Sequence, residues 1–221
     1  MAKQIAFIHT SPSVIPTFKS LADELIGQRG KVFNMVDESL LCDIIGHGCC
    51  PPATAKRLVG HVLAAEQAGA EIILVTCSSM GRAVEASRLL VASRVLRVDE
   101  PMAERAVATG KRIGVIATLP STLEPTAALI QARAAAAKKQ IALTTRVVDG
   151  AFAAVISGNG DKHDELVAAA LREMAKRVDV IVLAQASMAR VVETLRPQDR
   201  PVPILSSPRS AMEHLASLIE Q

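Results

Sequence analysis

The chain repeats part of its own sequence at a spacing of 108 residues. Residues 5–13 read IAFIHTSPS and residues 113–121 read IGVIATLPS, so that Ile, Ile, Thr, Pro and Ser recur in register. Residues 71–82, EIILVTCSSMGR, match residues 179–190, DVIVLAQASMAR, at the same spacing. Two separate matches at one spacing indicate an internal duplication, so we expect a fold made of two similar halves.

Each half alternates short apolar runs with segments of helical spacing. Runs of this kind are typical of parallel strands that are buried on both faces. The expected strands are 4–9, 32–36, 71–76, 94–98, 112–117, 143–148, 179–184 and 202–205. Helix-start signals precede the expected helices 14–27, 53–68, 122–139 and 164–177. This alternation predicts an α/β protein with two pseudo-symmetric parallel-sheet domains that face one another.

The duplication also suggests domain boundaries. We expect the first α/β domain to span residues 1–99 and the second to span residues 100–206. The segment SPRSAMEHL from residue 207 resembles the segment EPMAERA from residue 100. The C-terminal helix, 207–221, is therefore expected to cross back and complete the first domain.

Composition excludes several partners. Among 221 residues only 2% are aromatic, with no Trp or Tyr, so the stacking surfaces of single-strand nucleic-acid binders are missing. The basic residues are scattered, which argues against a phosphate-binding stripe. No apolar stretch approaches the roughly 18 residues of a membrane span, and the apolar run near the N-terminus is too short for a signal peptide. We expect a cytoplasmic protein that binds neither nucleic acid nor membranes; assembly into a homo-oligomer is left open.

The four cysteines lie within the first 77 residues. None of their spacings is that of a C-x-x-C or zinc motif, which argues against a structural metal and a disulfide framework. We therefore expect reduced thiols and no metal site.

In open parallel α/β sheets, ligands bind beyond the carboxyl ends of the strands. The residues at these ends are small, polar and rich in hydroxyl groups. They are His9, Thr10 and Ser11; Cys77, Ser78 and Ser79; Thr118 and Ser121; and Gln185, Ala186 and Ser187. Hydroxyl and backbone N–H groups at helix starts favour an anion, and we expect a carboxylate. No G-x-G-x-x-G or P-loop follows a strand, which disfavours a nucleotide.

Two of these residues are candidates for proton transfer. The thiolate of Cys77 would be stabilised by a helix dipole and by the amides of Ser78 and Ser79. His9 has an ordinary pKa near neutrality and ends the first expected strand. Packing roles remain open for both, because free cysteine is often buried and a strand-end histidine often packs or caps.

Two segments resemble known strand-end motifs. Residues 75–79, VTCSS, and residues 182–188, VLAQASM, look like the two motifs of the aspartate/glutamate/hydantoin racemase superfamily. The resemblance implies two pseudo-symmetric domains with the active site in the cleft between them, and acid–base chemistry by two cysteines without a cofactor. It places the first cysteine at Cys77. The substrate carboxylate would bind Ser78 and Ser79, and the cleft would also be lined by Thr10, Ser11, Thr118 and Ser121.

The second motif departs from this pattern. Gln185 stands 108 residues after Cys77, where the resemblance places the second cysteine, and a neutral amide does not exchange a proton near neutral pH. Gln185 would instead donate a hydrogen bond to the substrate, with Ala186 and Ser187 beside it. His9 is the candidate for the missing acid or base.

These observations favour a cofactor-independent isomerase or racemase-superfamily enzyme that acts on a small carboxylate or amino-acid-like substrate through Cys77. The alternatives are a single-thiol decarboxylase, a cis-trans isomerase of a small dicarboxylate, and a non-enzymatic carboxylate-binding protein. A redox thiol protein is a weaker alternative, since a resolving partner for Cys77 would have to be a spatial neighbour such as Cys49 or Cys50.

Overall fold

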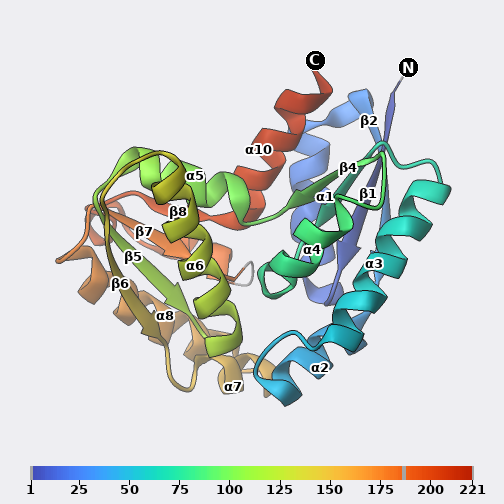
Figure 1. Ribbon diagram of the computed structural model, residues 1–221. Coiled ribbons are helices and arrows are strands. Elements are labelled where there is room, and N and C mark those ends of the chain that lie inside the picture. Colours follow the sequence, from blue (N-terminus) through green and yellow to red (C-terminus); the bar gives the residue numbers. More distant parts are fainter. Residues whose placement is uncertain (1, 186–187, 221) are drawn as a thin grey trace. The chain divides into compact units, whose positions relative to one another are not determined.

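A computed structural model describes residues 2–185 and 188–220 (Figure 1). The chain divides into two compact units. Unit 1 consists of Met1–Val98 together with Pro208–Gln221, and unit 2 is the continuous segment Asp99–Ser207. The C-terminal helix thus belongs to the unit that contains the N-terminus.

Unit 1 contains a four-stranded parallel sheet with the strand order β2-β1-β3-β4. Its strands are β1 (Lys3–His9), β2 (Gly30–Val36), β3 (Ile72–Val75) and β4 (Arg94–Arg97). Because β1 and β3 are adjacent and parallel, their carboxyl ends meet at the same edge of the sheet.

Helices cover both faces of this sheet. One face packs against α1 (Ile15–Leu25) and α10 (Ser207–Ile219), where Phe18 and Met212 are fully buried. The other face packs against α2 (Glu38–His47), α3 (Pro52–Gln67) and α4 (Gly81–Ser87). Side chains alternate between the two faces along each strand, as the helix-covered sheet requires.

Unit 2 repeats this arrangement with the strand order β6-β5-β7-β8, again entirely parallel. Its strands are β5 (Arg112–Ala117), β6 (Ala142–Val147), β7 (Val180–Leu183) and β8 (Ile204–Ser206). Its helices are α5 (Glu100–Thr109) and α6 (Pro120–Ala136) on one face, and α7 (Ala151–Ile156), α8 (Gly160–Ala175) and α9 (Ala189–Thr194) on the other. The predicted pair of parallel-sheet α/β domains is confirmed.

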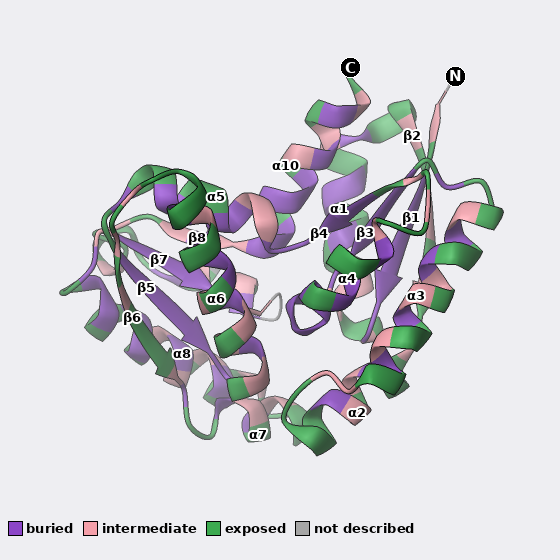
Figure 2. Ribbon diagram, viewed as in Figure 1, coloured by how far each residue is buried: buried purple, intermediate pink, exposed green. Residues whose placement is uncertain are grey.

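The central strands of both sheets are buried, whereas β6 lies at an edge and is largely exposed (Figure 2). Three helices were not expected from the sequence, namely α2, α5 and α7. Most are short, which leaves little room for a helical period to show. Within the described residues, every helix falls short of the length and apolarity needed to cross a bilayer.

Candidate functional site

Two strand-end residues of unit 1 are in direct contact. Thr10 follows β1 and Cys77 follows β3, and the backbone bond from Thr76 N–H to the Ile8 carbonyl (3.0 Å) holds the two strand ends together. The Thr10 hydroxyl donates a hydrogen bond to the Cys77 sulfur. Cys77 also caps a three-residue 3₁₀ turn, Ser78–Met80, that leads directly into α4.

Cys77 is partly accessible, and its surroundings act on the thiol in opposite directions. Burial in the protein raises the pKa of Cys77 and outweighs the hydrogen bonds that favour the thiolate. Those bonds come from the Thr10 hydroxyl, the backbone N–H groups of Ser79 and Met80, and the Ser79 side chain. The expected stabilisation of the thiolate is therefore outweighed by burial, and the amides that favour the thiolate are those of Ser79 and Met80 rather than Ser78 and Ser79.

This environment predicts slow alkylation of Cys77 at neutral pH. Because the pKa of the thiol lies above its ordinary value, the thiolate fraction should grow about tenfold per pH unit up to a midpoint above that of an ordinary cysteine thiol. Iodoacetamide labelling of the Cys77 peptide, followed by mass spectrometry between pH 6 and pH 10, measures this midpoint. A midpoint below pH 8 would contradict the dominance of burial.

The other predicted site residues of unit 1 lie close by in the chain. Ser78 and Ser79 are buried in the turn that follows Cys77. Ser11 caps a short 3₁₀ turn, Pro12–Val14, and its hydroxyl lies 2.8 Å from that of Ser13. Ser11 thus serves a local turn in the described structure, and its contact with a substrate stays a prediction.

His9 faces the other side of the sheet from Cys77. It lies two residues after Phe7 on the same face of β1, and its ring packs against that of Phe18 at a centroid separation of 5.6 Å. Its Nδ1 lies 2.8 Å from the Thr76 hydroxyl and its Nε2 lies 2.9 Å from Asn34 Oδ1.

Both ring nitrogens of His9 are thus occupied, and its side chain is 0% exposed. Burial lowers the pKa of His9, with an opposing contribution from the bond to Asn34. These are the contacts of a structural histidine, and a role as acid or base stays a prediction.

A second thiol lies near this site. Cys50 Sγ is 3.9 Å from the thioether sulfur of Met80, and both Cys50 and Cys77 pack against the core cluster that contains Met80. Burial raises the pKa of Cys50, and negative charge on Cys77 and on Cys49 raises it further. The half-buried packing of Cys50 is that of a structural residue.

Unit 2 presents a contact of the same kind at the corresponding positions. Thr118 follows β5 and Gln185 follows β7, at positions 108 residues after Thr10 and Cys77. Gln185 Oε1 accepts hydrogen bonds from the Thr118 backbone N–H (2.5 Å) and from the Thr118 hydroxyl (2.8 Å). Since a backbone N–H can only donate, the amide oxygen must face Thr118 and the NH₂ group points elsewhere.

The other residues predicted for the site in unit 2 are Ser121, Ala186 and Ser187. Ser121 lies in the first turn of α6, because that helix begins at Pro120, earlier than expected from the sequence. Ala186 and Ser187 lie outside the described residues.

One functional candidate was missed in the sequence. Arg97 ends β4 and lies opposite Val75 of β3 in the sheet register. Residues at alternate positions of a strand share a face, so Arg97 lies on the Cys77 face of the sheet. Its side chain is 5% exposed and forms an ion pair with Glu85 on α4. The strand-end rule, applied to the fourth strand, would have found it.

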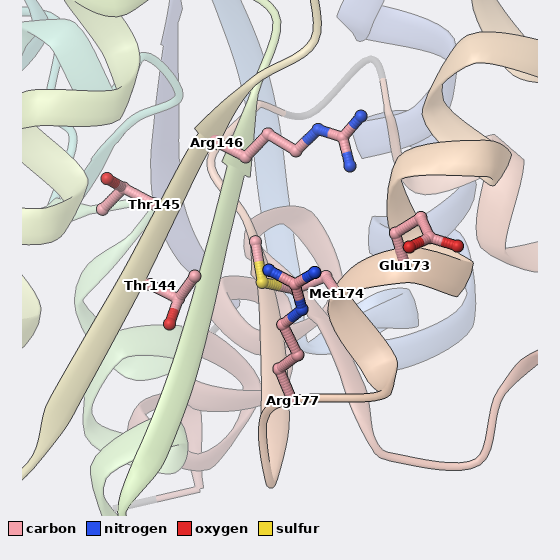
Figure 3. A pocket seen from close by; sticks show the side chains of 6 residues that line it. All are labelled: Thr144, Thr145, Arg146, Glu173, Met174 and Arg177. Carbon is pink, nitrogen blue, oxygen red and sulfur yellow. The ribbon is translucent and has the colours of Figure 1, made fainter.

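Two cavities in the described structure lie apart from the strand-end residues Thr10, Cys77, Thr118 and Gln185. A cavity of about 260 Å³ in unit 1 is lined by Ile8, Met35, Val36, Asp37 and His61. A cavity of about 190 Å³ in unit 2 lies between β6 and the end of α8 (Figure 3). Its lining is Thr144, Thr145, Arg146, Glu173, Met174 and Arg177. Across the described ranges, we find no cluster of three or more His, Cys, Asp or Glu residues that could hold a metal ion.

The sequence model of the Asp/Glu/hydantoin racemase family matches residues 6–215, nearly the whole chain. The chain belongs to this racemase family. None of the curated protein sequences compared with the chain matches it. Membership makes the protein an enzyme of the racemase class and accounts for its duplicated α/β fold.

Solved structures with racemase names share this fold. Picrophilus torridus aspartate racemase has a TM-score of 0.75 at 14% identity, covering 98% of this chain and 95% of its own. A Bacillus anthracis glutamate racemase isoform has 0.71 at 16%, covering 99% and 82%. Klebsiella pneumoniae allantoin racemase has 0.65 at 20%, covering 99% and 88%. At these identities the likeness concerns the racemase fold and leaves the substrate open.

Proposed function

We propose that this protein is a cofactor-independent enzyme that moves a proton at the carbon next to a carboxylate, with the Cys77 thiolate as the base. The substrate is a small carboxylate or an amino-acid-like molecule. The family membership and the names of the similar structures, aspartate, glutamate and allantoin racemases, support this class of substrate.

The observation that carries the proposal is the repeated threonine contact. Thr10 donates to Cys77 in unit 1, and Thr118 donates to Gln185 in unit 2. A threonine hydroxyl therefore donates a hydrogen bond at the equivalent strand ends of both units, but the acceptor is an ionisable group, the Cys77 thiol, only in unit 1. In this proposal Cys77 transfers the proton, and the NH₂ group of Gln185 donates a hydrogen bond to the same substrate.

The thiol environment suits such a base. A thiolate whose pKa lies above the ordinary value binds a proton more strongly, so it removes a weakly acidic C–H proton with a larger driving force. The Thr10 hydroxyl and the N–H groups of Ser79 and Met80 favour the thiolate and so offset part of the effect of burial. The hydroxyl-rich strand ends would bind the carboxylate.

Gln185 gives the reaction a specific signature. A carbanion formed by Cys77 regains its proton from the same thiol, because the amide of Gln185 is no acid. The Cys77 S–H group exchanges the abstracted proton with water before it returns a proton to the same face of the carbanion. The substrate hydrogen would then exchange with solvent much faster than the configuration inverts.

The same feature supports a second candidate, which is decarboxylation by one thiol. Loss of CO₂ from a malonate-type substrate leaves a carbanion that needs a single proton, and Cys77 can deliver it. Addition of the Cys77 sulfur to an unsaturated dicarboxylate, with cis-trans isomerisation, also needs one thiol only.

The test is incubation in D₂O with a panel of amino acids, malonates, maleate and hydantoins. We expect deuterium at the α-carbon of an amino-acid-like substrate, appearing on the order of 10²-fold faster than racemisation, as one missing acid–base group implies. A malonate that loses CO₂ with deuterium uptake would select the second candidate. If no member of the panel reacts, the protein is a carboxylate-binding protein instead.

A further inference from the structure

Arg97 is a buried cation beside the Cys77 turn that the proposed chemistry leaves without a role. Its side chain is 5% exposed and pairs with Glu85, whose own side chain is 47% exposed. Burying a guanidinium costs free energy unless it is paired, so its retention here calls for a specific contact. That contact is with the start of α4.

The guanidinium lies directly against the backbone of Gly81. A Cβ atom added to Gly81 would overlap the Nη2, Cζ and Nη1 atoms of Arg97 far more closely than van der Waals contact permits. The φ of Gly81 is −51°, which any residue can adopt. A larger residue at this position would therefore displace the guanidinium of Arg97, which fills the space beside Gly81.

Gly81 follows immediately on the turn that holds the thiol. Its N–H donates to the Ser78 carbonyl, and the preceding residue, Met80, donates its N–H to the Cys77 carbonyl (3.2 Å). The N–H groups of Ser79 and Met80 also favour the thiolate of Cys77. A shift of the α4 start would therefore move the donors that stabilise the thiolate.

We propose that Arg97 is a positioning residue, which clamps the start of α4 to β4 through Gly81 and Glu85 and so keeps the Ser78–Met80 turn aimed at Cys77. Arg97 acts through backbone amides and does not exchange a proton with the substrate. The inference rests on the proposed role of Cys77 as the reactive thiol.

The test uses the alkylation rate of Cys77 as a function of pH, which needs no substrate and so remains informative if the proposed reaction is wrong. We expect Arg97→Met to slow alkylation at pH 8 about tenfold and to raise the midpoint by about one pH unit, the size expected when hydrogen bonds to a charged group are lost. The alkylation midpoint of Arg97→Lys should lie between those of the wild type and Arg97→Met, since lysine retains the charge but lacks the planar guanidinium. Arg94→Met, at the exposed start of β4, is the matched control and should match the wild type.

A double-mutant cycle separates positioning from general stability. Gly81→Ala alone should displace the guanidinium and shift the profile in the same direction, whereas in the Arg97→Met background it should add little. A profile unchanged within twofold in Arg97→Met, even with a lowered melting temperature, would overturn the proposal. So would additive effects of the two substitutions. If Arg97→Met does not fold, the variants Gly81→Ala and Arg97→Lys provide the test. An unshifted midpoint of Cys77 alkylation in both of them would also overturn the proposal.

Discussion

Cys77→Ser is expected to lower turnover by at least about 10³-fold, the effect of removing a group that transfers the proton. Serine retains the size of the residue and can still accept the Thr10 hydrogen bond, but its hydroxyl is not ionised at any practical pH. The carboxylate-binding hydroxyls and amides remain in place. The loss should therefore appear in kcat, with little change in the affinity for a carboxylate inhibitor.

The matched control is Cys50→Ser, which removes the neighbouring thiol from the same core cluster and should leave kcat within a few-fold of wild type. Steady-state kinetics on the substrate found in the D₂O panel measures both variants. Turnover by Cys77→Ser within tenfold of wild type would place the base at another residue. A loss of equal size in Cys50→Ser would indicate that both thiols take part.

Gln185→Cys is expected to increase racemisation on the order of 10²-fold while α-hydrogen exchange stays similar. The Thr118 hydroxyl that now donates to Gln185 Oε1 can donate to a thiolate at position 185, as Thr10 does to Cys77. The variant would supply the second ionisable group that the chain lacks. Exchange and racemisation rates, measured together by NMR and chiral chromatography, should converge.

Gln185→Ser separates this gain from a simple enlargement of the site. It shortens the side chain in the same way and adds no group that ionises near neutral pH, so racemisation should stay low. The double variant Cys77→Ser/Gln185→Cys should lose the gain, because both thiols are needed. A folded Gln185→Cys protein with no added racemisation would count against a shared substrate for Cys77 and Gln185.

The fold could be predicted largely because the sequence is internally duplicated. Matches at one spacing and continuous apolar runs fix the strands, and parallel pairing follows from alternation with helices. The structure bears this out, with two sheets of equal strand order. A short helix such as α7 escaped the prediction, since six residues hold too little of a helical period.

The site was less predictable, because its properties depend on neighbours from distant parts of the chain. The sequence indicates that Cys77 precedes a helix start, but only the packed structure shows that burial outweighs the amides. Similarly, the ring of His9 is bonded to Asn34 and Thr76, and nothing in its own segment indicates either partner. Arg97 is a further example, since its ion pair and its contact with Gly81 depend on how α4 packs.

The C-terminal helix also affects how the protein is made on the ribosome. Ala211, Met212 and Leu215 of α10 pack with Phe18 in the core of unit 1, so α1 alone covers this sheet face until residues 207–219 have left the ribosomal tunnel. Unit 2 is a continuous segment and can complete its own core earlier during synthesis. The part of the unit 1 sheet that α10 covers would stay exposed until that helix packs. The nascent unit that carries Cys77 would thus complete its core after unit 2.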